Sequence, residues 1–434
     1  MTAPRESIAE TTSRRLLEDQ YVTRAEAIAL LEIKPATLYT YVSRGLIRRV
    51  NAPGRKLSFY LREDLDRIRT RSGARTSDAV LAAGAIRYGE PVVPTSITEI
   101  TPEGPRYRSR NAIDLAQAGV GFEAVAELLW TGILLDRRDP WQFRPPRREF
   151  LKLINDACRL AHPVGLHDAF MFVTLATAMS IGPPQARLSQ AAASSLAARE
   201  LIMLLTGCFG LLLRKPAYRA PRPGETVAEA IAAGLELPIG LKPERALDAA
   251  LVLSADHELN PSTFVARITA SSESDLHSCI ASAIGTHSGA RIARACDGLD
   301  EFFRKPMSAA SLVPRPGSGG AGPDIATLGF NHPLYARGDQ RAICLLDIVR
   351  RLNTRSRRVR NILAALDTAE RKHKQHPRLE TALAVLAIAL EMPPGAASGL
   401  STLARVAGWT AHVAEQRLGG FLIRPRAKFI QGAT

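Results

Sequence analysis

Apolar residues recur at helical spacing along most of the chain after residue 75. The segments are rich in Ala and Leu and are separated by Gly and Pro; in GFEAVAELLWTG, one helical face holds Phe122, Val125, Leu128 and Leu129. Aromatic residues make up only 6% of the chain, which disfavours an aromatic-rich β-sandwich. The pattern therefore predicts a mainly α-helical fold, interrupted by a loop over the Gly- and Pro-rich residues 305–324.

A different pattern occupies residues 1–75. The stretch YVTRAEAIALLEIKPATLYTYVSRGLIRRV predicts a short helix that begins at Thr23, where Glu26 completes a capping box. A second helix begins at about Pro35 and ends at Gly45, since Pro favours a first helical turn and Gly a helix end. Then NAPGRKLSFYL predicts a turn and a short strand, and REDLDRIRTR resumes as a helix.

This order resembles the winged helix-turn-helix of MerR-type and excisionase-type DNA-binding proteins, with residues 34–43 as the recognition helix. Such a helix presents its first side chains to base edges, while Lys and Arg of the helix and wing neutralise phosphates. The alternative is a folded docking element whose arginines form a solvated face. The candidates for DNA contact are Lys34, Thr37, Tyr41, Arg44, Arg48, Arg49, Arg55 and Lys56.

Charge and cysteine content restrict the possible partners and metal sites only slightly. Residues 1–75 hold 15 Lys and Arg against 9 Asp and Glu, a net +6 out of the +15 of the whole chain, which permits anionic partners without selecting one. The five cysteines are scattered without a C-x-x-C pair, so they indicate buried thiols and no metal site. The N-terminus lacks a signal-peptide pattern, and the apolar run Leu201–Leu213 is too short to span a bilayer, so we expect a cytoplasmic protein.

Four later segments together resemble citrate synthases in order and spacing over roughly residues 90–434. They are RYRSRNAIDLAQAGVGFEAVAELLWTG, LSADHELNPSTFVARITAS, GFNHPLYARGDQRA and AGWTAHVAEQRLGGFLIRPRAKF. The resemblance implies the citrate synthase fold, in which a large and a small subdomain are both helical. It places this domain at residues 76–434, with the large subdomain at about 76–292 and 391–434 and the small one at about 293–390.

The resemblance also implies a dimer that closes over oxaloacetate and acetyl-CoA, with no permanently bound cofactor. Two carboxylates and a ketone need several cationic donors, and planar guanidinium groups suit carboxylates best. The implied oxaloacetate-binding residues are His257, His332, Arg341, Arg405 and Arg424, the last reaching into the partner's pocket. The alternative is that each is an incidental polar residue, which would require five matches by chance.

The catalytic positions depart from the family's pattern. In citrate synthases a carboxylate removes a proton from the acetyl methyl group, one His polarises the thioester, and a second, here His332, polarises the ketone. The thioester His position falls on Ile292 in GARIARACD, and isoleucine can neither donate a hydrogen bond nor exchange a proton. The carboxylate position falls on Glu380 in PRLETALAVL, one methylene longer than the family's Asp. The resemblance therefore implies an impaired catalytic centre.

Two nearby features bear on that interpretation. His287 lies five residues before Ile292 and would restore a histidine if the backbone were shifted; the alternative is a helix-end or surface histidine. The basic run Thr354–Leu363 is followed by ERKHKQHPR, and the same resemblance implies that these charges meet the phosphates of coenzyme A. The alternative is a solvated helix face, which is the more frequent role of such a run.

Three functions remain open. In the first, a degenerate homologue keeps a dicarboxylate pocket and senses a ligand or supports a partner through the N-terminal module. In the second, the chain is an acyl-CoA:oxaloacetate C-acyltransferase of the tricarboxylic acid cycle type, which makes citrate from acetyl-CoA or 2-methylcitrate from propionyl-CoA. In the third, the chain forms a heterodimer with a catalytically complete homologue and contributes Arg424 to that partner's site.

Overall fold

The computed structural model divides into two compact units, which we describe separately. One comprises Met1–Pro94 and Arg424–Thr434, and the other comprises Thr95–Ile423. The predicted boundary at residue 75 and the subdomain limits stay predictions. The structure describes residues 21–31, 33–43, 47, 49–51, 58–62, 64–65, 93–135, 140–160, 165–181, 190–238, 240–312, 329–352 and 355–425.

The first unit contains two short helices and a small antiparallel sheet. Its described elements are β1 (Tyr21–Thr23), α2 (Arg24–Leu31), α3 (Pro35–Ser43), β2 (Arg49–Asn51) and β3 (Ser58–Leu61), in the strand order β1-β3-β2. The buried side chains of both helices and β3, among them Leu31, Leu38 and Tyr60, form its core.

The predicted helix starts in this unit are confirmed. Thr23 N donates to Glu26 Oε2 at 2.7 Å and Glu26 N donates to Thr23 Oγ1 at 3.4 Å, which is the expected capping box. The second helix begins at Pro35, as predicted. The wing turn with Arg55 and Lys56, and most of the helix expected after it, lie outside the described residues. The sequence pattern did not predict β1, which pairs Val22 with Tyr60 of β3.

The second unit is mainly helical. It opens with a three-stranded antiparallel sheet of β4 (Thr98–Thr101), β5 (Gly104–Tyr107) and β6 (Arg110–Asn111). Its described helices are α5 (Ala112–Gln117), α6 (Phe122–Thr131), α7 (Arg148–Leu160), α8 (Leu166–Ile181), α9 (Gln190–Thr206), η2 (Gly207–Leu212), α10 (Val227–Gly234), α11 (Leu241–Ser254), α12 (Pro261–Ser271), α13 (Leu276–His287), α14 (Ala293–Arg304), η3 (Ala309–Leu312), α16 (Gln340–Arg351), α17 (Arg357–His373), α18 (Leu379–Ala389) and α19 (Ala396–Gly419).

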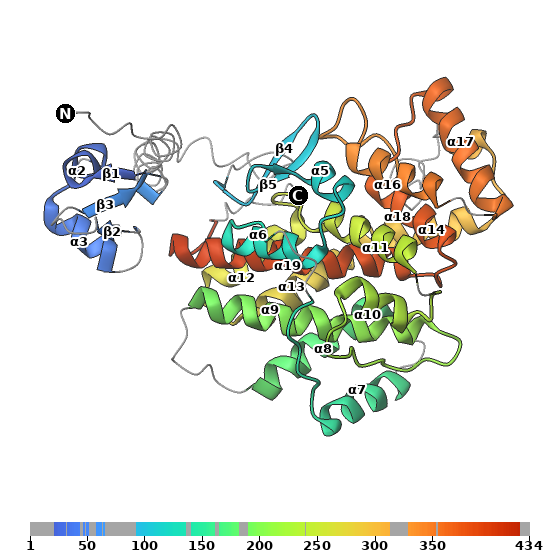
Figure 1. Cartoon of the computed structure of the whole chain (residues 1–434), viewed down its shortest axis with the longest axis horizontal. Coiled ribbons are helices and arrows are strands. Elements are labelled where there is room, and N and C mark those ends of the chain that lie inside the picture. The colour runs from blue at the N-terminus through green and yellow to red at the C-terminus, as the bar shows by residue number, and fades with distance from the viewer. Residues whose placement is uncertain are drawn as a thin grey trace, which may run out of the picture. The chain divides into compact units, whose positions relative to one another are not determined.

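The long helix α19 forms the centre of this unit. It is buried along most of its length and packs against α6, α9, α11, α12, α13, α14 and α18, so it runs through the middle of the helical layers (Figure 1). The predicted apolar face of α6 is confirmed, because Phe122, Val125, Leu128 and Leu129 are all buried in the same core. Of the loop expected over residues 305–324, Ala309–Leu312 form a short 3₁₀ helix and residues 313–328 lie outside the described residues.

Polar residues fix where the helices next to the candidate site begin. Asn260 caps α12 by accepting from Thr263 N at 2.9 Å, and Pro261 occupies the first turn. Asp275 caps α13 and Asp339 caps α16 in the same way. These caps satisfy backbone N–H groups that a helix start leaves free. They therefore fix the turns before α12, α13 and α16.

The structure describes one long apolar helix and the positions of all five cysteines. One described segment, Ser194–Leu212, is long and apolar enough to cross a membrane, but 61% of it is buried by its neighbours, as in the core helix of a globular protein. The five cysteines are all buried and unpaired, as predicted.

Candidate functional site

Two of the predicted histidines lie side by side with a tyrosine. His257 follows α11 and His332 lies in the turn before α16, and their ring centroids are 5.1 Å apart. Tyr335 stands 5.1 Å from the His332 ring, and its hydroxyl is hydrogen-bonded to His257 Nε2 at 2.9 Å. The structure therefore brings together residues that are 75 positions apart in the chain.

Arg341 joins this cluster and is held by Asp339. Both side chains are buried, and Arg341 donates to Asp339 through Nε at 2.9 Å and through Nη2 at 2.8 Å. The guanidinium carbon of Arg341 lies 5.4 Å from the centroid of the Tyr335 ring. Asp339 also accepts from Leu379 N at 3.1 Å, so one carboxylate fixes both Arg341 and the start of α18, next to Glu380.

Further hydrogen bonds connect the His332 segment to the start of α18. Arg378 Nε donates to Phe330 O at 2.7 Å, and Arg378 N donates to Gly329 O at 2.9 Å. Thr381 Oγ1 donates to Gly329 O at 2.6 Å. His332 and Glu380 are thus placed on two segments that are joined by hydrogen bonds.

Arg405 reaches the cluster from α19 and has unused donors. Its side chain is only 7% exposed, yet Nε and Nη1 have no hydrogen-bond partner among the described residues. Burial lowers the pKa of the Arg405 guanidinium, and the charges of Asp256, Arg341 and Glu380 act on it. A buried cation with free donors is costly in a folded protein unless a charged group meets it. The arrangement can therefore receive an anion.

A fully buried pair lies behind Arg405. His412 Nε2 and Asp256 Oδ2 are 3.2 Å apart, and both side chains are inaccessible to solvent. Burial alone would raise the pKa of Asp256, but His412 and Arg405 offset this, and the pKa is lowered. Asp256 therefore remains a carboxylate directly before His257.

The two histidines of the cluster are neutral at ordinary pH. Burial, together with the charge of Arg341, lowers the pKa of His332 to about 4 and that of His257 well below its usual value. Burial also raises the pKa of Tyr335 to about 12. His332 Nδ1 accepts from Leu334 N at 3.2 Å, so the proton of the neutral ring is on Nε2, which is then a hydrogen-bond donor.

Glu380 lies in the first turn of α18 and Ile292 at the start of α14. Glu380 is half-buried, and its Oε2 has no partner among the described residues. Helices α14 and α18 pack together, and Cys296 Sγ contacts Glu380 O at 3.8 Å. Ile292 is half-buried and caps α14 without a side-chain hydrogen bond.

His287 is the last residue of α13 and is buried, not on the surface. Its ring stands 5.5 Å from that of Trp409, and Arg405 lowers its pKa further below the value that burial alone would give. Ser262 donates to Asn260 Oδ1 at 2.7 Å, so the contact of 3.3 Å between Ser262 Oγ and His287 Nδ1 places the proton on Nδ1. His287 Nε2 is then a buried acceptor, with no partner among the described residues.

The remaining predicted residues lie elsewhere. Arg424 is exposed and belongs to the first unit. Lys34 is exposed and Thr37 is half-buried, whereas Tyr41 packs against the core of the first unit. Arg44 and Arg48 lie outside the described residues, and of Arg49 only the strand position is described.

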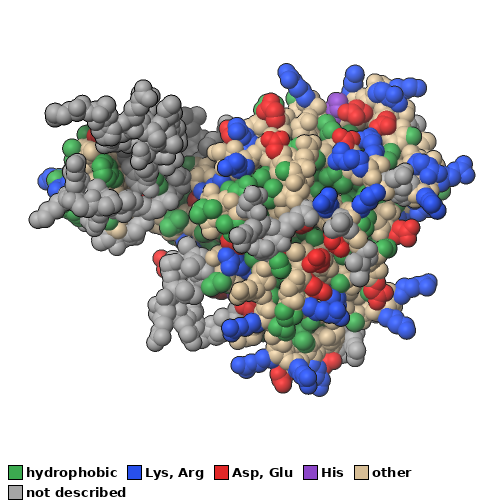
Figure 2. Space-filling model, viewed as in Figure 1, with side chains coloured by type: hydrophobic (Ala, Val, Ile, Leu, Met, Phe, Trp, Pro, Cys, Tyr) green, Lys and Arg blue, Asp and Glu red, His purple; other side chains and the backbone are tan. Residues whose placement is uncertain are grey.

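Lys and Arg side chains are frequent over α16 and α17 on the face shown in Figure 2. Part of the basic run Thr354–Leu363 forms the first turns of α17, where Arg357, Arg358 and Arg360 are exposed. Within the described ranges, no group of three His, Cys, Asp or Glu side chains could hold a metal ion.

Sequence reasoning missed several residues that build this cluster. Tyr335 lies in the segment GFNHPLYARGDQRA, but no local pattern shows that its hydroxyl meets His257. Asp339 carried a usable signal, because Asp directly before a helical pattern is a helix cap. The role of Arg378 depends on contacts with Phe330 and Gly329, nearly 50 residues away, which sequence spacing does not reveal.

Comparisons with known proteins agree with this architecture. The family described as "Citrate synthase, C-terminal domain" matches residues 88–426. The chain is 27% identical to 2-methylcitrate synthase 2 of Corynebacterium glutamicum over 367 residues, which cover 79% of this chain and 93% of that protein. It is 26% identical to a citrate synthase of Mycolicibacterium smegmatis over 352 residues, or 77% of this chain and 92% of that protein.

Solved structures show the same fold. The citrate synthase of Thermoplasma acidophilum, solved in a ternary complex with carboxymethyl coenzyme A and oxaloacetate, superposes with a TM-score of 0.66 at 19% identity, over 80% of this chain and 95% of that one. The citrate synthase of Pyrobaculum aerophilum gives a TM-score of 0.63 at 22% identity, over 80% and 91% of the two chains. With the family match over most of its length, this chain belongs to the citrate synthase family.

Proposed function

We propose that the second unit binds an oxaloacetate-type dicarboxylate through His257, His332, Arg341 and Arg405. The observation that carries the proposal is the buried Arg405 guanidinium, whose Nε and Nη1 have no hydrogen-bond partner among the residues that the structure describes. A carboxylate would accept both hydrogen bonds and neutralise the charge. The neutral His332 would offer its Nε2 proton to the ketone oxygen.

We propose further that turnover is weak or absent, as the replaced residues imply. Ile292 supplies no proton at the position of the thioester-polarising His. His287 does not replace it readily, because its buried Nε2 is an acceptor in the neutral ring and because its lowered pKa disfavours the charged donor form. Loss of such a group typically reduces the rate by about 10²–10⁴-fold. The protein would then sense a dicarboxylate or support a partner.

The second candidate is an active citrate or 2-methylcitrate synthase. It is favoured by Glu380, a carboxylate whose Oε2 has no partner in the described part of the chain, and by His287, which lies close enough to Arg405 for that charge to lower its pKa. The relatives from C. glutamicum and M. smegmatis carry these two names. In this reading Glu380 would take the methyl proton of acetyl-CoA or propionyl-CoA, and His287 would have to change its protonation to polarise the thioester.

Thiol release from acetyl-CoA or propionyl-CoA with oxaloacetate separates the two candidates. For the impaired centre we expect little release from the unmodified chain and a gain of at least about tenfold in Ile292→His. Turnover at ordinary rates that falls in His287→Ala would instead establish the active enzyme. Glu380→Gln is the control, because it should abolish whatever release is seen.

For the first unit we propose a winged helix-turn-helix module that contacts DNA. The support is the order of α2, α3 and the small sheet, together with the exposed Lys34 at the start of α3. Binding to duplex DNA should weaken steeply with salt, and Lys34→Ala should weaken it across sequences. Absence of DNA binding at low salt would leave the alternative, a docking element for another protein.

We also propose a cytoplasmic dimer. Its partner is a second copy or a catalytically complete homologue, and Arg424 would enter the partner's pocket. Co-purification of an untagged copy, compared with an untagged homologue, tests which dimer forms, and Arg424→Ala tests the shared pocket by its effect on oxaloacetate affinity.

A further inference from the structure

The two buried arginines of the polar cluster differ in how they are paired. Arg341 donates to Asp339 through Nε at 2.9 Å and through Nη2 at 2.8 Å, so a carboxylate already occupies two of its donors. Arg405 is also buried, but its Nε and Nη1 have no hydrogen-bond partner among the residues that the structure describes. A guanidinium and a carboxylate that lie close together usually pair through two hydrogen bonds. The unpaired donors of Arg405 therefore need a cause if a carboxylate lies near them.

Asp256 is such a carboxylate. Positions 405, 408 and 412 of α19 are separated by three and four residues and so lie on one face of the helix. Asp256 contacts this face at His412 and at Gly408, where an added side chain would collide with Asp256 Oδ1. Burial lowers the pKa of Arg405, and the charge of Asp256 opposes that shift, so the two charges are close enough to interact. Asp256 thus lies between Arg405, one turn before Gly408, and His412, one turn after it.

His412 and the local backbone hold this carboxylate in place. His412 Nε2 lies 3.2 Å from Asp256 Oδ2, and since a carboxylate only accepts hydrogen bonds, Nε2 carries the proton. Glu258 N donates to the same oxygen at 3.2 Å. The Tyr107 hydroxyl lies 3.1 Å from Asp256 O and accepts from Asp256 N at 3.3 Å, which fixes the backbone. A turn of Asp256 toward Arg405 would therefore have to come from the side chain alone.

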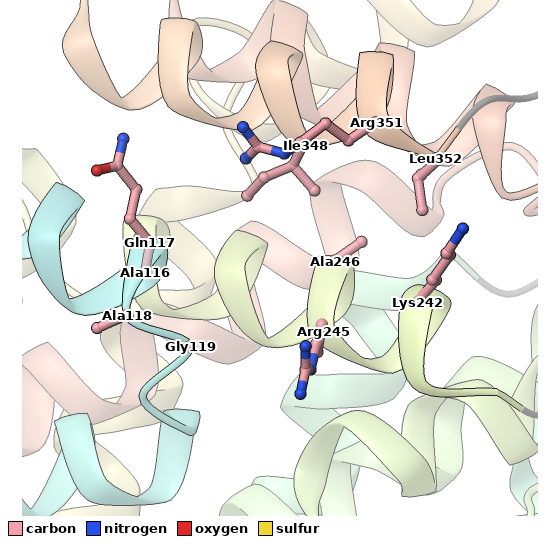
Figure 3. Close-up of a pocket in the computed structure, with 10 residues that line it drawn as sticks. All are labelled: Ala116, Gln117, Ala118, Gly119, Lys242, Arg245, Ala246, Ile348, Arg351 and Leu352. Atoms are coloured by element: carbon pink, nitrogen blue, oxygen red, sulfur yellow. The ribbon is translucent and has the colours of Figure 1, made fainter.

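The other cations on α11 lie too far away to attract Asp256. Lys242 and Arg245 line a cavity where α5, α11 and α16 meet, at the opposite end of α11 (Figure 3). Arg245 is nine residues before Ser254, the last residue of the helix, which is roughly 14 Å along its axis. An Asp256 side chain that lost its contact with His412 would therefore turn to Arg405.

We propose that His412 is a positioning residue that holds Asp256 away from Arg405, so that the Arg405 donors stay available to a ligand carboxylate. Without the Nε2 proton of His412, Asp256 pairs with Arg405 as Asp339 pairs with Arg341. The ligand must then displace a buried carboxylate before it can bind. The effect on ligand affinity rests on the proposed function, whereas the effect on the Asp256 side chain does not.

The alternative is that His412 only fills the core, since its side chain is fully buried. A packing role would be impaired by any replacement of the ring and would not depend on the charge of Asp256. The two roles are separated by Gln, whose side-chain amide can donate where the histidine Nε2 does, and by Leu, which fills volume without a donor.

Calorimetric titration of the full chain with oxaloacetate tests the effect on affinity. We expect His412→Leu to weaken binding at least about tenfold, because a buried carboxylate then competes for the Arg405 donors. His412→Gln keeps a donor and should stay within about threefold of the unmodified chain. In an Asp256→Asn background the neutral amide cannot neutralise Arg405, so His412→Leu should change the affinity less than about threefold.

The matched control is Thr410→Val, a conservative change at another buried position of α19. The Thr410 hydroxyl donates to Val406 O of the same helix at 2.8 Å, so its loss perturbs α19 without touching Asp256. We expect an unchanged affinity for oxaloacetate. Urea unfolding should show that every variant is folded at the titration temperature.

Crystal structures of the variants test the same proposal without a ligand. In His412→Leu we expect a carboxylate oxygen of Asp256 within hydrogen-bond distance, about 3 Å, of Arg405 Nε or Nη1. In His412→Gln we expect Asp256 to keep the orientation that it has in the unmodified chain.

The failure of this proposal can be told from the failure of the proposed function. Absence of oxaloacetate binding by the unmodified chain would refute the dicarboxylate pocket, while the crystals would still decide the role of His412. Unchanged affinity in His412→Leu, an equal loss in His412→Gln, or the same loss in the Asp256→Asn background would overturn the positioning role. So would an Asp256 side chain that keeps its place in crystals of His412→Leu.

Discussion

At the scale of residues, the site depends on charged groups that are buried with incomplete partners. Arg341 donates to Asp339 through Nε and Nη2, whereas Arg405 and Glu380 keep atoms without partners among the described residues. Leaving a buried polar atom unpaired costs about 1–3 kcal/mol and more when it is charged. Such unpaired atoms are therefore maintained at a cost in stability, and at Arg405 this supports the proposal that a ligand meets them.

The carboxylate of Asp339 should be critical for folding. Asp339→Asn would leave the buried Arg341 without its counter-charge, and we expect a loss of about 3–5 kcal/mol in the free energy of unfolding, measured with urea. The control is Asp347→Asn, which breaks the exposed pair with Arg350 and should cost at most about 1 kcal/mol. Equal losses in the two variants would show that Asp339 does not have the role assigned to it.

At the scale of elements, the close approach of α19 to the chain before His257 fixes the site. Gly408 N donates to Ala255 O at 3.1 Å, and a side chain at Gly408 would collide with Asp256 and with the carbonyl of Ala255. This contact holds α19, and with it Arg405, against the segment that leads to His257.

Gly408→Ala should therefore weaken both the fold and the site. We expect a loss of about 1–3 kcal/mol in unfolding free energy, together with reduced oxaloacetate affinity, because the two segments must separate. Gly285→Ala on α13 is a suitable control, since its added methyl meets only the flexible end of Met171 and should be nearly neutral or stabilising. A harmless Gly408→Ala would contradict the close packing described here.

Glu123 joins two helices in a pH-dependent way. It lies on α6 and accepts from Val227 N, at the start of α10, at 2.6 Å; burial and the neighbouring Asp248 raise its pKa to about 7. Because the pKa of Glu123 is higher in the folded than in the unfolded protein, the protonated side chain contributes on the order of 3 kcal/mol to the free energy of unfolding. This contribution is complete below about pH 4.5 and is lost as the pH rises through 7. Urea unfolding between pH 5 and 8 should show this fall, and Glu123→Gln should flatten it. An unchanged slope in the variant would exclude Glu123 as the cause.

The sequence predicts those features that depend on neighbours along the chain. The capping box of Thr23 and Glu26, the helix start at Pro35 and the apolar face of α6 follow from local rules, and each is confirmed. The burial of His287 does not follow from such rules, because it depends on Trp409 of α19, more than 120 residues later. The same holds for Tyr335 against His257, which requires two distant turns to meet.

At the scale of the whole molecule, family membership and the helical fold are shown, and the proposed function rests on a few side chains. The chain belongs to the citrate synthase family over residues 88–426, yet Ile292 and Glu380 stand at the positions implied for its catalytic groups. Ligand binding, which we propose for Arg405 and the histidines, is therefore distinct from turnover, which the proposed loss of a proton donor at Ile292 would reduce. We expect binding to persist in a protein that releases little thiol.

The most direct test is a calorimetric titration of the full chain with oxaloacetate, beside Arg405→Met and the control Arg358→Gln. We predict one binding site per chain, unchanged by Arg358→Gln and weakened at least about tenfold by Arg405→Met. Because Arg405→Met also removes a charge that offsets the burial of Asp256, urea unfolding of the variant must show that it is folded at the titration temperature. Undetectable binding of oxaloacetate, or equal affinity in the Arg405→Met variant, would contradict the dicarboxylate pocket.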